Sequence, residues 1–346
     1  MTGPTTITIA EIARLAGVGT ATVDRVINGR PGVNAETIEK VRQVIDGLQE
    51  SSFGRGRPRG NDGLRFVYVL PDGDSPFLAQ VERHIAHMAG DFRHQHITAI
   101  LHRFSADDPG KFAADLAQVG DCDGVAVMAV DVPAIKRSIA DLVRAGIHVI
   151  TLFSDVAGSA RQLFVGADNR AAGRTAGLLI GNMAGMPNQD TVLLLSQTTR
   201  LSAEIERRIG FAQVIEERFP RLQLVRMTDL PMDDEGVLRA LVDFFQEEMD
   251  PVRLAGAYVV GLGVAGLVRS LAQMALAGKQ RIVAHDHTDV HASLLATGDI
   301  DFLLYQDIHY CISTAANALR KLCENARGAL NIVQPRVEIL TVENLH

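Results

Sequence analysis

The stretch Thr8–Leu48, TIAEIARLAGVGTATVDRVINGRPGVNAETIEKVRQVIDGL, predicts three short helices with a tight turn between the first two. Thr8 and Glu11 form a capping box at the start of the first helix, ahead of apolar residues at helical spacing. Gly17-Val18-Gly19 ends that helix, because glycine accepts the left-handed backbone of a tight exit. Asn34 is expected to cap the third helix. This arrangement is a helix-turn-helix, whose second helix would enter a DNA major groove.

The second helix, about Thr20 to Ile27, presents two different faces. Its apolar pattern directs four side chains inward: Ala21, Val23, Val26 and Ile27. Thr20, Asp24 and Arg25 lie on the other face. A generic three-helix packing unit is the alternative, since helix-turn-helix patterns alone give many false positives.

The run IARLAGVGTATVDRVINGRPGVNAETIEKV closely resembles the headpiece of the LacI/GalR family of transcription regulators. The resemblance implies that Thr20, Ala21 and Arg25 contact base edges and that Asn28 bonds a phosphate. A bidentate bond from Arg25 to guanine would be worth roughly 1–3 kcal/mol of discrimination. One headpiece is a small footprint, so a homodimer on a pseudo-palindromic operator is expected.

Length, charge and cysteine content agree with a DNA-binding protein of more than one domain. The 346 residues exceed one usual domain, and residues 1–60 carry a net charge of +2 within a chain of net charge −7. A mildly basic head on an acidic body suits DNA contact at one end. Three cysteines without a C-x-x-C pair suggest reduced thiols. The sequence shows no signal peptide and no long apolar run, so a cytoplasmic protein without membrane contact is expected.

Residues 49–63, QESSFGRGRPRGNDG, form a basic Gly/Arg linker that marks a domain boundary. Here the chain departs from the resembled family, which carries a hinge helix with a groove-wedging leucine; no leucine occurs between Leu48 and Leu64. The string RGRPR resembles instead the core of an AT-hook, so Arg55 and Arg57 are predicted to lie in a narrow A·T minor groove. The alternative is a linker that contacts phosphates without sequence preference.

From Leu64 onward, short β-rich runs alternate with helical segments, which predicts parallel sheets covered by helices on both faces. The candidate strands are 65–70, 97–103, 124–128, 148–153, 163–166, 191–196, 223–227, 255–260, 281–285 and 301–305. The candidate helices are 77–95, 109–119, 132–145, 170–186, 203–218, 234–248, 265–277 and 308–327. So many strands in one run suggest two sheets side by side.

Several stretches, among them RFVYVLPDGDSPFL, VGADNRAAGRTAG, ERRIGF and YQDIHYCISTAANAL, resemble a type I periplasmic-binding-protein fold of the ribose-binding kind. The same regulators carry this fold. The resemblance implies a headpiece at 1–48 and an effector domain at 64–346. Its first lobe would span about 64–166 and 306–331, and its second about 167–305 and 332–346. Ligands bind such sheets at the carboxyl ends of the strands, in the crevice.

A small polyhydroxy ligand needs bidentate polar partners and an apolar plate. Residues at predicted strand ends supply them, several at positions that match the family: Phe77, Asp131, Asp155, Asn169, Arg207, Asp286 and Gln306. Some of these positions have alternative roles: Asp131 and Asp168 could be helix N-caps, Arg207 could be a solvated charge on its helix, and Phe77 could be a core residue. The chain has no Trp and four Tyr, which favours a monosaccharide or polyol over a bulky disaccharide.

Two further motifs suggest other chemistry. Gly261–Gly266 is a G-x-G-x-x-G that follows a strand, opens a helix and precedes Asp286 at a suitable distance, as in a dinucleotide site. It lies deep in the strand array, where this fold has a crevice loop, so no cofactor is expected. The segment 285–291, HDHTDVH, clusters possible metal ligands, but no third ligand is fixed by spacing and a ligand-contact loop is preferred.

The sequence therefore predicts a sequence-specific transcription regulator that acts as a repressor. A small sugar or polyol is expected to bind it and to control its affinity for DNA. No local arrangement supplies a catalytic nucleophile, so no enzymatic activity is expected. Two alternatives remain open: a solute-binding protein for transport, and an NAD-dependent enzyme built on Gly261–Gly266.

Overall fold

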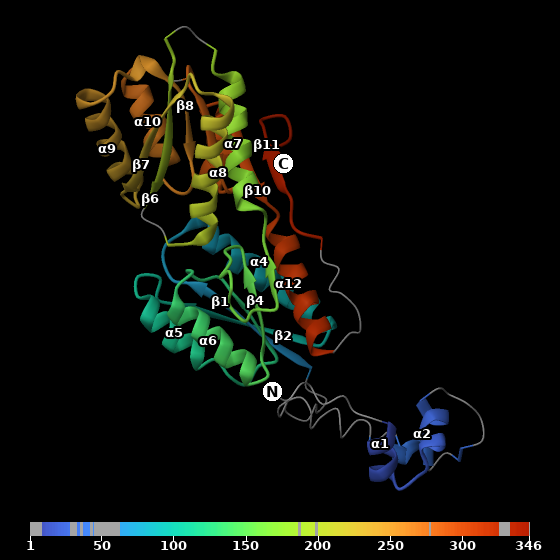
Figure 1. Cartoon of the computed structure of the whole chain (residues 1–346). Helices are drawn as coiled ribbons and strands as arrows, with labels where there is room; N and C mark the ends of the chain where they lie inside the picture. Colours follow the sequence, from blue (N-terminus) through green and yellow to red (C-terminus); the bar gives the residue numbers. More distant parts are fainter. Residues whose placement is uncertain are drawn as a thin grey trace. The chain divides into compact units, whose positions relative to one another are not determined.

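The computed structural model describes residues 9–27, 33–34, 37–41, 44, 63–185, 188–197, 200–276, 278–324 and 333–345. The chain divides into two compact units, one that holds the first 62 residues and one that begins at Gly63 (Figure 1). Each unit has its own buried apolar core.

The N-terminal unit contains α1 (Ile9–Ala16), α2 (Thr20–Ile27) and a further helical stretch at 37–41. Gly17 has a φ of +66° and ends α1, as predicted. The Asn34 side chain accepts a hydrogen bond from the Thr37 amide at 2.8 Å, which confirms the predicted cap. The core of this unit consists of Ile12, Ala13, Ala16, Val23 and Val41.

One prediction about α2 was wrong: Ala21 is exposed, whereas Val23 is fully buried. Residues two apart in a helix are rotated by about 200° and cannot share a face. Ala21 therefore lies with Arg25, four residues later, which is also exposed. The predicted capping box at Thr8, the phosphate contact at Asn28 and the minor-groove arginines Arg55 and Arg57 lie outside the described residues.

The first sheet of the C-terminal unit has five parallel strands in the order β2-β1-β3-β4-β5. They are β1 (Leu64–Pro71), β2 (Ile97–Phe104), β3 (Gly124–Val127), β4 (His148–Leu152) and β5 (Leu163–Val165). The helices of this lobe, lobe 1, are α4 (Pro76–His94), α5 (Pro109–Ala117), α6 (Pro133–Arg144) and α12 (Ile308–Cys323). Helices α4 and α12 cover one face over Phe66, Tyr68 and Leu70.

The second sheet, in lobe 2, has six strands in the order β11-β10-β9-β8-β6-β7, with β11 antiparallel. They are β6 (Thr191–Gln197), β7 (Gln223–Leu230), β8 (Leu254–Val259), β9 (Arg281–His285), β10 (Phe302–Gln306) and β11 (Val337–Leu340). The helices are α7 (Asn169–Met183), α8 (Ser202–Arg218), α9 (Asp234–Glu247), η1 (Pro251–Arg253), α10 (Val264–Gln273) and α11 (Asp289–Thr297). The sequence predicted all ten parallel strands and missed β11 and α11.

Alternate residues of each strand of lobe 2 pack on opposite layers of helices. Val192 and Leu194 face the core under α7 and α8, and Leu193 and Leu195 face the core under α9 and α10. Burial on both faces explains why the middle of β6, from Val192 to Leu195, is a continuous apolar run instead of alternating. The helices on either side of the sheets are visible in Figure 1.

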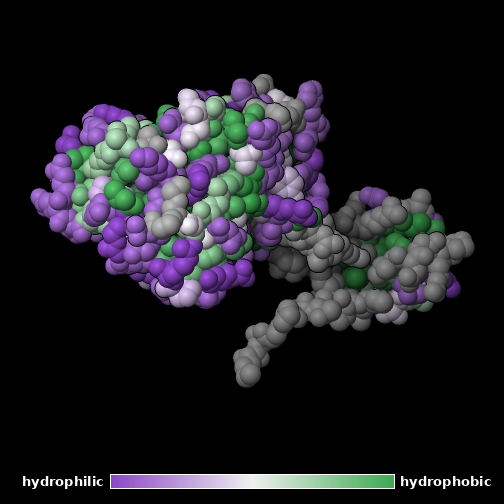
Figure 2. All heavy atoms as spheres, turned by 90° about the horizontal axis from the view of Figure 1, so that it is seen from above, coloured by the Kyte–Doolittle hydropathy of each residue, from purple (hydrophilic) through white to green (hydrophobic). Residues whose placement is uncertain are grey.

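The chain passes between the lobes at three places. It leaves lobe 1 between β5 and α7, returns between β10 and α12, and enters lobe 2 again between α12 and β11. In the view of Figure 2, apolar and hydrophilic side chains alternate over the surface, as is ordinary for a folded protein. In the described part of the chain, no helix is long and apolar enough to cross a membrane. Cys122, Cys311 and Cys323, all described, form no disulfide.

Helices α7 and α8 approach each other more closely than side chains would normally allow. A Cβ atom on Gly173 would lie 1.9 Å from the carbonyl oxygen of Arg207, and one on Gly210 would lie 2.1 Å from that of Arg170. Both contacts are with backbone atoms, which cannot move aside cheaply. The two glycines therefore fix the distance between the two helices that carry Asn169 and Arg207.

Substituting Gly173→Ala should destabilise the protein by about 2 kcal/mol or more, because the added methyl group overlaps a backbone carbonyl. Gly90→Ala is the matched control: Gly90 also lies in a helix, but nothing lies within 4 Å of the position that a Cβ would take there. At that site alanine should stabilise by about 0.5–1 kcal/mol. Urea unfolding measures both, and equal effects of the two substitutions would contradict the packing argument.

Candidate functional site

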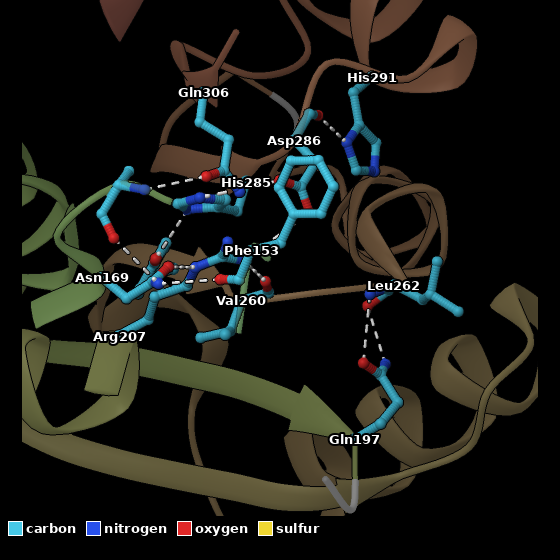
Figure 3. A network of polar contacts seen from close by, with 12 residues as sticks. Phe153, Asn169, Gln197, Arg207, Val260, Leu262, His285, Asp286, His291 and Gln306 are labelled. Carbon is cyan, nitrogen blue, oxygen red and sulfur yellow. Dashed lines mark hydrogen bonds and ion pairs between the residues drawn. The ribbon is translucent and has the colours of Figure 1, made fainter. Parts of the chain in front are cut away.

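A network of polar side chains lies at the carboxyl ends of the lobe 2 strands, centred on Arg207 of α8 (Figure 3). The Arg207 side chain is 6% exposed. Its Nε donates to the Asn169 Oδ1 at 2.8 Å, and its Nη1 donates to the carbonyl of Val260 at 3.4 Å and lies 3.7 Å from the Asp286 Oδ2. A guanidinium out of water is tolerated only when paired and hydrogen-bonded, and these contacts meet that condition.

Asp286 follows β9 directly and has a φ of +66°, which an aspartate accepts more readily than most residues. Its side chain is 17% exposed, and burial raises the pKa of its carboxyl group despite the Arg207 charge. Among the described residues, no donor hydrogen-bonds to the buried Oδ1. An unsatisfied buried acceptor costs about 1–3 kcal/mol, so this oxygen is a suitable partner for a ligand hydroxyl.

His285 precedes Asp286 and is held inside the lobe. The Tyr258 hydroxyl lies 3.1 Å from its Nδ1. Burial, followed by the Arg207 charge, holds the pKa of His285 well below 6.5, so the ring is neutral at physiological pH. The 3.8 Å approach of its Nε2 to the Asp286 Oδ1 is therefore no ion pair.

Lobe 1 contributes two phenylalanines opposite this network. The rings of Phe77 and Phe153 meet edge to face with centroids 5.2 Å apart, and the carbonyl of Phe153 accepts from the Asn169 Nδ2 at 3.5 Å. Phe153 has a φ of +61°, a strained conformation for an aromatic residue. Asp286, in the network, also has a positive φ.

Gln306 is the last member of the network and lies at the end of β10, where the chain passes from lobe 2 to lobe 1. Its Oε1 accepts from the Ala167 amide at 3.2 Å, and its side chain is buried. A further contact spans the crevice, since the Gln80 Nε2 of α4 donates to the carbonyl of His287 at 2.5 Å. The two lobes therefore meet in the described structure through side-chain hydrogen bonds to the backbone.

The structure brings together Asn169, Arg207, Asp286 and Gln306, with Phe77 near them, whereas two other predicted ligand residues form salt bridges outside this network. Asp131 pairs with Lys136 at 2.8 Å near the start of α6. Asp155 pairs with both Nε and Nη2 of Arg161 and accepts from the Thr151 hydroxyl at 2.7 Å. Asp168 caps α7, which was the alternative role considered for it.

The G-x-G-x-x-G segment has structural roles in this fold. Gly263 has a φ of +93° at the start of α10, and a Cβ on Gly266 would lie 2.6 Å from the carbonyl of Asp234 in α9. The Leu262 amide, which a dinucleotide phosphate would need, donates to the Gln197 Oε1 at 3.2 Å, and the Gln197 Nε2 donates back to the Leu262 carbonyl at 2.8 Å. The loop is thus fixed by Gln197 rather than open to a phosphate.

The segment 285–291 also has a structural account. His291 lies in α11, where its Nδ1 contacts the carbonyl of Asp286 at 2.8 Å. Within the ranges that the structure describes, no three His, Cys, Asp or Glu side chains converge as metal ligands. The histidines instead hold the loop that carries Asp286.

In the N-terminal unit, the exposed face of α2 carries Thr20, Ala21 and Arg25. These three positions were predicted to contact base edges. Behind them, Val23 packs into the core with Ile12 and Ala16. The buried face fixes the orientation of the short helix, and the outer face is accessible in the unit.

Two families match the chain. Residues 66–327 match the family described as Periplasmic binding protein domain, and residues 8–49 match Bacterial regulatory proteins, lacI family. The fold and the matches define a two-lobed binding domain joined to a helix-turn-helix headpiece. The chain belongs to the periplasmic-binding-protein-domain family and, by its headpiece, to the lacI family of DNA-binding transcription regulators.

Individual relatives agree. HTH-type transcriptional regulator AglR of Rhizobium meliloti (strain 1021) is 24% identical over 291 residues, which cover 81% of this chain and 78% of AglR. GanP, a glucose-galactose binding protein from Geobacillus stearothermophilus, superimposes with a TM-score of 0.71 at 16% identity, over 82% and 99% of the two chains. A solute binding protein from Burkholderia graminis C4D1M in complex with D-arabinose gives 0.71 at 19% identity, over 83% and 98%.

Sequence reasoning missed Phe153, Tyr258 and Gln197 as parts of the site. Phe153 ends a predicted strand on the crevice side, which is a usable signal, although a strand-end phenylalanine is usually core. Tyr258 contacts His285, and Gln197 hydrogen-bonds the backbone of Leu262. Such supporting contacts leave no pattern in the sequence.

Acid should destabilise lobe 2 through His285. The folded state keeps its imidazole neutral, whereas the unfolded chain binds a proton below about pH 6.5, so stability falls as the pH drops through that value. We expect His285→Gln to lose less stability than the wild type between about pH 7 and pH 5. Urea unfolding at each pH measures this. His102→Gln, at an exposed histidine of β2, should keep the wild-type slope, and identical slopes for both variants would contradict the assignment.

Proposed function

We propose that the crevice network holds a small uncharged sugar or polyol and that this ligand controls binding to operator DNA, in the manner of a repressor. The observation that carries the proposal is the buried Asp286 Oδ1, an acceptor that receives no hydrogen bond from the described residues, beside the paired Arg207. A ligand hydroxyl supplies the donor. The partly buried Phe77, which packs edge to face on the buried Phe153, supplies apolar surface for the face of a sugar ring.

The charges of the network favour a ligand without charge. Arg207 already has Asp286 as its counter-ion, and His285 is neutral. An anionic ligand would compete with Asp286 for one guanidinium, and a cation would compete with Arg207 for one carboxylate. A hydroxyl-rich neutral molecule satisfies both without displacing either. The neutral sugars that GanP and the arabinose-bound protein bind agree with this class.

At the DNA, we propose that Thr20, Ala21 and Arg25 contact base edges, with Arg25 bound to a guanine. The exposed arginine on a helix whose opposite face is buried supports this assignment. The predicted contacts of Asn28, Arg55 and Arg57 would add phosphate and minor-groove binding. A homodimer acting in the cytoplasm on a pseudo-palindromic operator completes the proposal.

The general test is a gel shift of the full-length protein on DNA from upstream of its own coding sequence, with a panel of sugars and polyols added. Release of the DNA by one neutral member of the panel is the expected result. If no member changes the shift, while calorimetry finds none that binds, the sugar-controlled regulator is wrong.

Replacing Arg207→Lys should weaken binding of that sugar about tenfold to a hundredfold, because a charge-assisted hydrogen bond is worth about 1.5–3 kcal/mol. Lysine cannot donate to Asn169, Val260 and Asp286 from one planar group. Arg208→Lys is the matched control on the same helix, since Arg208 is outside the network. Isothermal titration calorimetry gives both affinities, and equal losses in the two variants would remove Arg207 from the site.

Replacing Arg25→Lys keeps the charge but loses the bidentate contact, so affinity for the specific DNA should fall about fivefold to a hundredfold. Binding to unrelated DNA should not change, because phosphate attraction depends on charge. Arg14→Lys, at an exposed arginine of α1, serves as the control. Fluorescence anisotropy at one salt concentration measures all three proteins; a parallel loss on both DNAs would show that Arg25 contacts phosphate only.

A further inference from the structure

A hollow lies beside the crevice network, where the chain passes between the lobes. It has a volume of about 360 Å³. We call it the hinge cavity, and its lining includes Asp155, Phe164, Ala167, Ser202, Glu206 and Pro335. Asn169 of the crevice network also lines it, whereas Arg207, Asp286 and Phe153 do not, so the hinge cavity shares one wall with the network. Its volume falls in the range of small-molecule sites.

The walls of the hinge cavity come from both lobes and from two of the chain passages between them. The Ser202 hydroxyl of α8 donates to the carbonyl of Asp155 at 2.6 Å and lies 3.0 Å from the Ser154 hydroxyl of lobe 1. On another wall, the Gln334 Nε2 donates to the carbonyl of Phe164 at 3.2 Å. A molecule in the cavity would therefore contact groups whose relative positions change when the lobes move.

The chemistry of the hinge cavity suits an uncharged, largely apolar molecule. Its apolar surface comes from Phe164, Ala167, Ala203 and Pro335. The Phe164 ring lies against Gly166, where a Cβ atom would be 2.5 Å from the Phe164 Cζ.

The charged lining residues already have partners. Arg170 pairs with Glu206 at 2.5 Å, Asp155 pairs with Arg161, and Asp168 caps α7. The cavity therefore offers no charge for a ligand to neutralise, while Ser202 and Gln334 stand at its walls as polar groups.

We propose that the hinge cavity is a second ligand site, for a small neutral molecule with an aromatic or alicyclic ring and one hydroxyl group. Because both lobes form its walls, occupancy stabilises one arrangement of the lobes and alters the affinity of the crevice for its own ligand. By linkage, the crevice ligand changes the affinity of the hinge cavity by the same factor. The existence of the hinge-cavity site does not depend on the identity of the crevice ligand.

The test uses three probes with one carbon skeleton on the full-length protein: 2-phenylethanol, 2-phenylethylamine and phenylacetate. Calorimetry and thermal unfolding should show binding and stabilisation by the neutral probe, with affinity about fivefold or more above both charged probes. Binding of a charged probe equal to that of 2-phenylethanol, or no binding of any probe up to the solubility limit, would overturn the proposal.

Two variants locate the probe. Phe164→Leu removes the ring and Ala203→Leu fills the cavity; each should weaken 2-phenylethanol binding about fivefold or more. Phe104→Leu, at a partly buried strand-end phenylalanine of lobe 1, is the matched control and should bind as the wild type does. Loss of binding in Asp286→Asn, with Phe164→Leu unaffected, would place the probe in the crevice and refute a separate site. That outcome would leave the sugar proposal untouched.

Discussion

The buried guanidinium of Arg207 ties three separate parts of lobe 2 together: α7 through Asn169, the end of β8 through Val260, and the loop after β9 through Asp286. Removing such a charge from water costs several kcal/mol, which only good geometry offsets. That geometry requires the backbones of α7 and α8 to touch, and Gly173 and Gly210 permit it. Close helix packing is therefore the precondition for the chemistry of the crevice.

One amide links this network to the other lobe. Asn169 accepts from Arg207 through Oδ1 and donates to the carbonyl of Phe153 in lobe 1 through Nδ2. Separation of the lobes would break that bond, together with those from Gln80 to His287 and from Ser202 to Asp155. Each such bond contributes about 1 kcal/mol net, so closure depends on only a few kcal/mol. A ligand of modest affinity is sufficient to shift an equilibrium of that size.

The sequence predicted the fold well because both of its strongest signals are local. Helical spacing with Gly17 and Asn34 at the helix ends gives the headpiece, and the alternation of apolar runs with amphipathic helices gives the parallel sheets. It missed β11, which is an exposed antiparallel edge strand with a burial pattern unlike its neighbours. It also missed α11, because the segment 285–291 was assigned to a ligand-contact loop. It also directed Ala21 inward, since alanine is apolar enough to fit either face.

The candidate site was less predictable, since a strand-end position does not fix where a side chain points. Asn169, Arg207, Asp286 and Gln306 converge because helix packing and the left-handed turn at Asp286 aim them at one another. Asp155 occupies an equally good strand-end position, but Arg161, six residues later, captures it. Both carboxylates have an arginine partner, but Asp286 keeps a buried oxygen that receives no hydrogen bond from the described residues.

The size of the required control follows from these same contacts. A tenfold change in operator occupancy needs a coupling of only about 1.4 kcal/mol. In the proposed dimer, each protomer contributes its own crevice, so one hydrogen bond of about 1 kcal/mol gained per crevice already exceeds that value. In the proposed switch, Arg207 and the open acceptor of Asp286 would set the specificity for the ligand, while the weak contacts between the lobes would set the sensitivity. A regulator built this way needs a precise site but not a tight one.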